Sequence, residues 1–224
     1  MDHFSVKTVP DRTASDWLPL AAEHLGLIPA TQAILLDTAF RPAQWNGRGV
    51  GALRIVQTLL DTARISFLEL RQLLGTRFVN PNGVLVINYT VGEGEDAEFV
   101  CDLEQARIEA LAPPHLNRIA RFVRLQRTLG WSIHELDSVL HALGGEIDEG
   151  ALVALSFIRT LHERLKTPLL VVASWVADID THDYLTDEDE MARSLYATLF
   201  LNRTVGGDEE LLPFELSSLG SGII

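Results

Sequence analysis

The residues best placed for chemistry form an acidic run between Asp178 and Glu190, which contains seven carboxylates and no lysine or arginine. The run begins Asp-x-Asp, as calcium-binding loops do, because alternate carboxylates supply the first ligands. However, Asp183 stands where such a loop needs glycine, and Asp189 takes the twelfth position in place of a bidentate glutamate. We therefore interpret the run as a solvated loop with acid at the next helix N-terminus. A calcium site on Asp178, Asp180 and Asp189 is kept as an alternative.

Other motifs for metal, nucleotide or nucleophilic chemistry are incomplete. The pairs His134-Glu135 and His162-Glu163 would need a second histidine four residues after the first to bind zinc, but Ser138 and Lys166 stand there. The glycines of 47–51 follow no predicted strand, and the chain has no Gly-Lys-Ser/Thr and no Gly-x-Ser-x-Gly. The sequence therefore predicts no catalytic residue, no cofactor and no enzyme activity.

Four arginines at three-residue spacing precede a glycine turn and a second helix: Arg118, Arg121, Arg124 and Arg127. A helix-turn-helix over residues 118–143 would read DNA, and we keep such a regulator as an alternative function. Each step of three residues turns about 60° around a helix, so the arginines wind beside apolar residues such as Phe122. We expect them to extend along the edges of a buried face. The following helix begins with acid, which suits a phosphate backbone poorly.

The composition supports a folded, acidic protein. The 224 residues are 47% hydrophobic, and 18 basic against 31 acidic residues give a net charge of −13. That sign argues against nucleic acid and anionic lipid as partners. The single cysteine, Cys101, excludes an internal disulfide, and the polar N-terminus shows no signal peptide. The longest apolar run, 169–177, is too short to cross a bilayer, so we expect no direct membrane insertion by this segment.

Periodicity and turn signals predict a mainly α fold of packed short helical hairpins with a small inserted β-hairpin or sheet around residues 84–111. We expect an irregular lead-in over 1–17, a first helical part over 18–83 with a break at Pro29, and a second helical part over 112–205. An irregular tail follows over 206–224. Helices are expected at 52–63, 66–74, 114–129, 132–143, 148–165, 168–177 and 188–200. Within the insertion, 84–90 should pair with 97–103, and a third extended piece is expected at 105–111.

Two helix entries share one design. Ser66 and Ser132 each precede a glutamate by three residues, Glu69 and Glu135 respectively, which is the spacing of a capping box. Trp131, directly before the second serine, fits the hydrophobic staple that fixes the chain entering a helix. These residues are predicted to be structural.

The second half resembles the A components of bacterial insecticidal toxin complexes (Tc toxins), in the N-terminal region of the virulence plasmid A protein type. Residues 121–137 (RFVRLQRTLGWSIHELD) are similar to a family segment that includes Arg121, Phe122, Arg124, Trp131 and Ser132. Three further stretches agree in order: 70–80 (LRQLLGTRFVN), the tryptophan at 175 followed by 178–180 (DID), and 194–202 (SLYATLFLN). The resemblance covers about residues 18–214.

The resemblance implies a structural, non-catalytic role. Tc toxin A components are large secreted or cell-surface proteins that form homopentamers, with a translocation channel inside an α-helical shell. This chain would belong to that shell, as a fragment or a short relative. Its partners would be the rest of an A subunit, copies of itself and the B and C components, and it would meet the host cell surface only indirectly. A small acidic adaptor for another protein is a further alternative.

Overall fold

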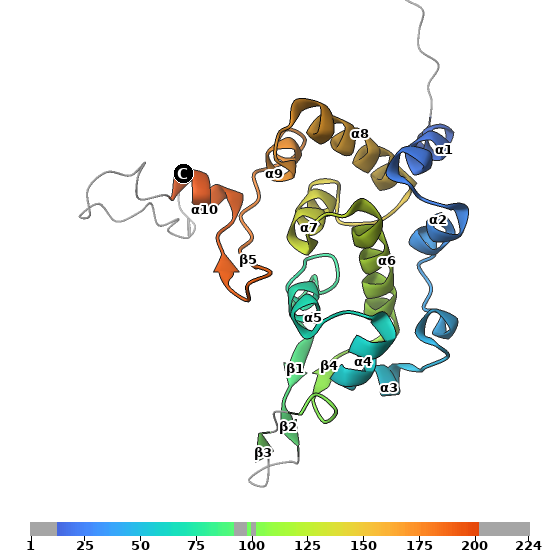
Figure 1. Cartoon of the computed structure of the whole chain (residues 1–224), viewed down its shortest axis with the longest axis vertical. Coiled ribbons are helices and arrows are strands. Elements are labelled where there is room, and N and C mark those ends of the chain that lie inside the picture. The colour runs from blue at the N-terminus through green and yellow to red at the C-terminus, as the bar shows by residue number, and fades with distance from the viewer. Residues whose placement is uncertain (1–12, 92–97, 100–101, 202–224) are drawn as a thin grey trace, which may run out of the picture.

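The structure, a computed structural model, describes residues 13–91, 98–99 and 102–201, and this part of the chain is mainly α-helical, as predicted (Figure 1). The α-helices are α1 (Ala14–Leu25), α2 (Pro29–Leu36), α3 (Val50–Leu53), α4 (Val56–Ala63), α5 (Phe67–Leu74), α6 (Pro113–Leu129), α7 (Ile133–Ala142), α8 (Glu149–Leu165), α9 (Leu169–Ala173) and α10 (Leu195–Phe200). A short 3-10 helix, η1, spans Pro42–Trp45. Among the described residues, no helix is both long and apolar enough to cross a membrane.

The strands are short and pair in twos. They are β1 (Val86–Asn88), β2 (Thr90–Val91), β3 (Glu98–Phe99), β4 (Arg107–Glu109), β5 (Tyr184–Leu185) and β6 (Met191–Ala192). Antiparallel pairs form between β1 and β4, between β2 and β3, and between β5 and β6. The first two pairs make the predicted insertion, which projects from one end of the helical body (Figure 1).

The long helix α6 lies in the middle of the molecule, with α2 on one side and α5 and α7 on the other (Figure 1). Its apolar residues at three- and four-residue spacing, among them Leu116, Ile119 and Phe122, are fully buried. The Phe122 ring lies 5.7 Å from that of Phe78, in the loop after α5. The α6 core therefore joins the two helical parts, which the β insertion separates in sequence.

Both predicted capping boxes are present. The Glu69 backbone N–H donates to Ser66 Oγ at 3.1 Å, and the Ser66 N–H donates to the Glu69 carboxylate at 2.6 Å. Ser132 and Glu135 make the same reciprocal pair at 3.2 and 3.0 Å. Trp131 is buried beside the second box. These bonds satisfy backbone donors that the first turn of a helix leaves without partners.

Replacing Ser132 with alanine should lower the free energy of unfolding by about 1 kcal/mol, because the Glu135 N–H loses its acceptor at the start of α7. Urea denaturation measures this loss. Ser132→Thr is the matched control, since threonine also caps a helix and should recover most of the stability. Equal losses in the two variants would show that packing at this position, rather than the cap, is what matters.

The predicted boundaries need correction in the first helical part. Residues 14–17 belong to α1 rather than to an irregular lead-in. The predicted break at Pro29 is present, since α1 ends at Leu25 and Pro29 is the first residue of α2. The helix expected over 52–63 divides into α3 and α4 at Arg54 and Ile55. There the chain pairs with β4 and the residue before it: the Ile108 N–H donates to Arg54 O at 2.8 Å, and the Val56 N–H donates to Ala106 O at 3.0 Å. Backbone bonds across the fold have replaced helical ones.

The strand pairing inside the insertion also differs from the prediction. Strand β1 pairs with β4, so the third extended piece at 105–111 is its partner, and only β2 returns along β3. The Asn88 side chain accepts the Thr90 N–H at 2.8 Å, a local turn that separates β1 from β2. A single continuous strand over 84–90 is therefore wrong.

The C-terminal helices are shorter than predicted. Helix α9 ends at Ala173, and the helix expected over 188–200 begins only at Leu195. Before it, the Thr186 hydroxyl accepts the N–H groups of Glu188 and Glu190, at 3.3 and 3.2 Å, and turns the chain between β5 and β6. The predicted tail over 206–224 lies outside the described residues.

Candidate functional site

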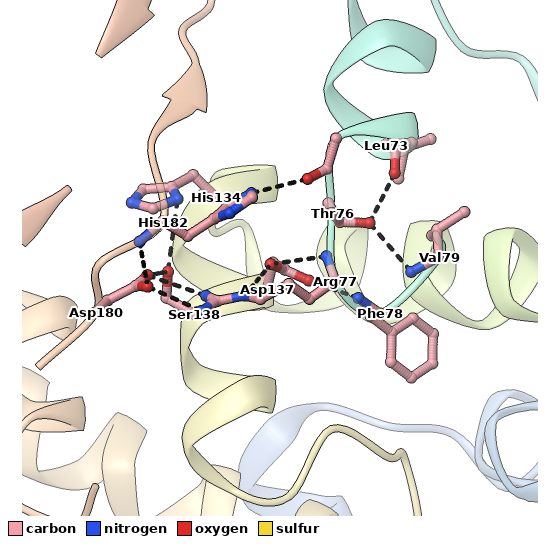
Figure 2. Close-up of polar contacts among 11 residues, drawn as sticks. Leu73, Thr76, Arg77, Phe78, Val79, His134, Asp137, Ser138, Asp180 and His182 are labelled. Atoms are coloured by element: carbon pink, nitrogen blue, oxygen red, sulfur yellow. Dashed lines mark hydrogen bonds and ion pairs between the residues drawn. The ribbon is translucent and has the colours of Figure 1, made fainter. Parts of the chain in front are cut away.

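Arg77, in the loop after α5, forms ion pairs with two carboxylates, Asp137 and Asp180 (Figure 2). Its guanidinium donates to both oxygens of Asp180, at 2.9 and 3.0 Å, and its Nε donates to Asp137 at 3.2 Å. Both carboxylates are largely buried, with 3% of the Asp137 side chain and 10% of the Asp180 side chain exposed. Bidentate pairing of this kind fixes orientation as well as charge. We call Arg77, Asp137 and Asp180 the charged node.

The node ties together three segments that are distant in sequence. Asp137 lies on α7 and also accepts the backbone N–H groups of Arg77 and Phe78, at 3.2 and 2.9 Å. Asp180 lies between α9 and β5, and it accepts the Ser138 hydroxyl and the His182 N–H. The three groups therefore hold the 75–80 loop and the chain around residue 180 on one face of α7.

The pKa of Asp180 reflects this environment. Burial raises the pKa of the carboxyl, but hydrogen bonds from Ser138, Arg77 and the His182 backbone outweigh burial, and the pKa is held below its usual range. The carboxylate is therefore ionised near neutral pH, as its bidentate pairing with the Arg77 guanidinium requires.

His134 lies beside the node, under the β5 strand. Its ring stacks on Tyr184 with centroids 3.3 Å apart, and its Nε2 is buried without a hydrogen-bond partner among the described residues. Burial lowers the pKa of His134 to about 4, although Asp180 and Asp137 act in the opposite direction. Its Nδ1 lies 3.5 Å from Ser138 Oγ.

Ser138, His134 and Asp180 do not form a catalytic triad. In a triad the carboxylate orients the histidine, and the histidine removes the serine proton. Here the Ser138 hydroxyl donates to Asp180, and a histidine with a pKa of about 4 is a weak base. The arrangement is suited to holding α7 and the 180–184 segment together.

Because His134 is buried, we predict that the fold loses stability on acidification at pH values above those at which carboxylates ordinarily titrate. The unfolded His134 has an ordinary pKa near 6.5 and the folded one about 4, so between these values the unfolded chain binds more protons. The free energy of unfolding should fall as the pH drops from about 6.5 toward 4. Asp180, whose pKa is lowered, adds to the loss only at lower pH. Urea unfolding across this range measures the slope.

His134→Gln should reduce that slope, because the side chain no longer titrates. The matched control is His141→Gln, which changes an exposed histidine on the same helix. A slope that falls equally in both variants, or in neither, would assign the pH dependence to other groups.

The three calcium candidates do not meet. Asp180 is bound to Arg77, Asp189 forms an ion pair with Arg71, and Asp178 is exposed. Within residues 13–91, 98–99 and 102–201, no three histidine, cysteine or acidic side chains are grouped so that they could hold a metal ion. Two of these carboxylates, Asp180 and Asp189, pair with arginine side chains, which occupy the positions that a metal ion would need.

Arg121 corrects the expectation for the α6 arginines. It is 3% exposed and does not reach solvent along the edge of the helix. Its Nε donates to Leu35 O at 2.6 Å, near the end of α2, and its Nη2 donates to Ile147 O, just before α8. Burial lowers its pKa. The buried guanidinium satisfies the Leu35 carbonyl, at the end of α2 where helix carbonyls lack helical partners, and a loop carbonyl at Ile147.

The other α6 arginines are less buried. Arg118 donates to Phe78 O at 2.7 Å and pairs with Glu146, while its guanidinium lies 5.2 Å from the Phe78 ring centre. Arg127 donates to Arg64 O at 2.6 Å, and Arg124 is half-buried. The geometry opposes the DNA-binding alternative, because the second helix of the motif, α7, is buried on most of its surface between α5 and α9.

Two cavities flank the node, with volumes of about 410 and 490 Å³. The first lies between α7 and the segment after α9, and the second lies between α5, β1 and β5. Their size would admit a small molecule. The charged side chains that line them from the node already pair with one another, so neither cavity presents a free charged group of the node to a ligand.

The four sequence elements that carry the resemblance converge on the node. Arg77 belongs to the 70–80 element, Asp137 ends the 121–137 element, and Asp180 closes the DID sequence. The fourth element begins at Ser194, whose N–H donates to Asp183 at 2.8 Å, and its Tyr196 N–H donates to Asp180 O at 3.0 Å. Sequence reasoning did not single out Arg77 or Asp137. The available signal was an aspartate on an otherwise apolar face of α7, between Ile133 and Leu140.

Comparisons of the chain with models of protein families, with curated proteins and with solved structures find no match. The functional conclusion therefore depends on the residues and their geometry.

Proposed function

We propose that the chain is a non-catalytic structural segment of the α-helical shell of a Tc-toxin-like A subunit. The single observation that carries the proposal is the convergence of the four resembling elements around the charged node: three supply its side chains, and the fourth bonds to the Asp180 backbone. Motifs shared for a catalytic purpose would be expected to present reactive groups in a cleft. Here they supply the groups that join α5, α7 and the chain around residue 180.

The electrostatics of the node favour this role. Each of its charged atoms is used by a partner of the same chain, and His134 is neutral at physiological pH because its pKa is about 4. A charge fully engaged in internal bonds positions chain segments but has little left to offer a substrate. The arrangement therefore supports a mechanical function.

The helical body also has apolar surface that a larger assembly would cover. Trp175 and Val176 after α9, and Leu199 and Phe200 of α10, each have about half of their surface exposed. Single exposed apolar residues are ordinary, but groups of them mark contact surfaces. In the proposed shell, neighbouring segments of the A subunit would cover these positions.

The test is to isolate the native particle that contains the chain from the cells that produce it, using an antibody raised against the purified chain. We expect a large particle with fivefold symmetry in electron micrographs, with the antibody bound to its outer wall. A chain that instead runs as a free monomer would overturn the proposal. A small complex with one other protein would favour the adaptor alternative, and binding to duplex DNA at low salt would favour the regulator.

The purified chain alone should be monomeric or weakly associated by size-exclusion chromatography with light scattering, because its natural neighbours are missing. A stable pentamer of the chain by itself would contradict that expectation.

A further inference from the structure

Strand β1 has one paired edge and one free edge. Among the described strands it pairs only with β4, antiparallel, with Ile87 opposite Ile108 (Figure 1). Along such a pair, residues alternate between exchanging hydrogen bonds with the opposite residue and directing both backbone groups away from it. The Ile108 N–H donates to Arg54 O, on the side of β4 away from β1. Ile87 therefore directs its own N–H and C=O away from β4, toward the free edge of β1.

These two backbone groups of Ile87 have no hydrogen-bond partner among the described residues. Leu85, two positions earlier, has the same orientation, but the Asn80 side chain bonds to both its N–H and its C=O, at 3.0 and 3.2 Å. An unpaired donor and acceptor on a strand edge can pair with the backbone of another strand. Ile87 is thus the position at which β1 can accept one.

The cavity of about 490 Å³ lies along this free edge. Its lining includes Leu85, Val86 and Ile87. Successive residues of a strand point to opposite faces, so a cavity that touches all three lies along the strand edge rather than over one face. Strand β4 occupies the other edge. The opposite wall includes Tyr184 and Leu185 of β5, and the cavity therefore separates two strand edges.

The uncompensated charge around this cavity is acidic. Asp183 lines it and forms no ion pair with a described residue. The turn between β5 and β6 adds four exposed acidic residues at 187–190. Arg71 is the one lysine or arginine in the described lining that is not a member of the charged node, and its charge is already paired with Asp189. A segment that enters the cavity meets negative charge, so its complement is basic.

We propose that the free edge of β1 binds an extended segment of a partner protein in which lysine or arginine alternates with apolar residues. The partner backbone bonds to the N–H and C=O of Ile87 and adds a strand between β1 and β5. Its apolar side chains pack on cavity residues such as Leu74 and Tyr89, and its basic side chains face Asp183. In strand addition, main-chain bonds give affinity and side-chain contacts give specificity.

A second copy of this chain is a poorer occupant, because it brings another acidic β5–β6 hairpin to the same surface. The inference does not depend on the proposed shell role, since it concerns one strand edge and the cavity beside it.

The test measures binding of a nine-residue peptide that alternates lysine and valine, by fluorescence anisotropy at low salt. Ile87→Pro should weaken binding roughly three- to tenfold, because proline removes the edge N–H. Proline is tolerated where a strand N–H faces outward, so the pairing of β1 with β4 should persist. The matched control is Ile87→Val, which keeps the N–H and should bind within about twofold of the natural chain.

The peptide itself supplies the second control. Methylating its backbone nitrogens should weaken binding at least about threefold, whereas methylating its lysine side chains, which keeps their charge, should not. These peptides leave the chain unchanged, so they test the backbone bond even if Ile87→Pro fails to fold. A peptide with glutamate in place of lysine should bind at least about tenfold more weakly.

Asp183→Asn should weaken binding of the lysine peptide roughly threefold, because it removes the charge but keeps an acceptor for the Ser194 N–H. Asp61→Asn is its matched control, since it changes the net charge equally at an exposed position on α4, outside the cavity lining. Equal weakening in both variants would assign the effect to net charge and contradict the proposed contact.

Hydrogen exchange by NMR gives a direct readout of the strand edge. In the free chain the Ile87 amide should exchange faster than those of Val86 and Asn88, which face β4, and the lysine peptide should slow it roughly tenfold. No change at Ile87, or equal affinity for the two backbone forms of the peptide, would overturn the proposal. So would protection of Ile87 that rises with protein concentration without peptide, since it would assign the edge to a second copy. Failure to find a native particle would leave these results unaffected, so the two proposals fail separately.

Discussion

Replacing Arg77 with methionine is expected to lower the free energy of unfolding by about 3–5 kcal/mol, because it leaves two largely buried carboxylates without their cation. Asp137 would keep the N–H groups of Arg77 and Phe78, whereas Asp180 would keep only Ser138 and the His182 N–H. Asp180 should therefore lose more of the stabilisation of its charged form. Urea denaturation near neutral pH measures the loss, and the pKa of Asp180 should rise in the variant.

The matched control is Arg71→Met, which breaks the ion pair between Arg71 and Asp189. That pair is exposed by 41% and 53% at its two side chains, so we expect a loss below about 1 kcal/mol. Combining Arg77→Met with Asp137→Asn and Asp180→Asn should recover part of the lost stability, since neutral side chains need no buried cation. Similar small losses in Arg71→Met and Arg77→Met would show that the node is no more than a surface ion pair.

Short sequence motifs predicted the fold well where the hydrogen bonds join residues that are close in sequence. The capping boxes at Ser66 and Ser132 depend on residues three positions apart, so the sequence shows both partners at once. The break between α3 and α4 could not be predicted in this way. It arises because Arg54 and Val56 bond to backbone groups some fifty residues later, and no local propensity reports such a partner.

The candidate site shows the same division. The acidic run predicted a solvated loop with acid at the next helix N-terminus, but the structure places the β5–β6 hairpin there, buries most of Asp180 and has no acid in the first turn of α10. The partners of Asp180 and Asp189 lie on or after α5, more than a hundred residues earlier. The spacing of the aspartates did not exclude a calcium site, because a carboxylate can bind either a metal cation or an arginine side chain. The expectation that Arg121 would reach solvent was wrong for a similar reason. The carbonyls that accept its hydrogen bonds come from α2 and from the loop before α8, which are distant in sequence.

Phe122→Ala is expected to cost about 3–5 kcal/mol, because the side chain is fully buried and its removal leaves a cavity in the middle of α6. Phe200→Ala is the matched control. That ring is 54% exposed, so its loss should stay below about 1 kcal/mol. Phe122→Leu should fall between the two, because leucine refills part of the volume. If Phe122→Ala lowered the free energy of unfolding as little as Phe200→Ala, Phe122 would not be part of the core that stabilises the fold.

The two large losses should not add when Arg77→Met and Phe122→Ala are combined. The Phe122 ring packs on Phe78, and the Phe78 N–H donates to the carboxylate that binds Arg77. A cavity at Phe122 lets the 75–80 loop relax, which already weakens the node. The double variant should therefore lose less than the sum of the two single losses, by about 0.5–3 kcal/mol in a double-mutant cycle. Strict additivity would mean that the core and the charged node stabilise the fold independently.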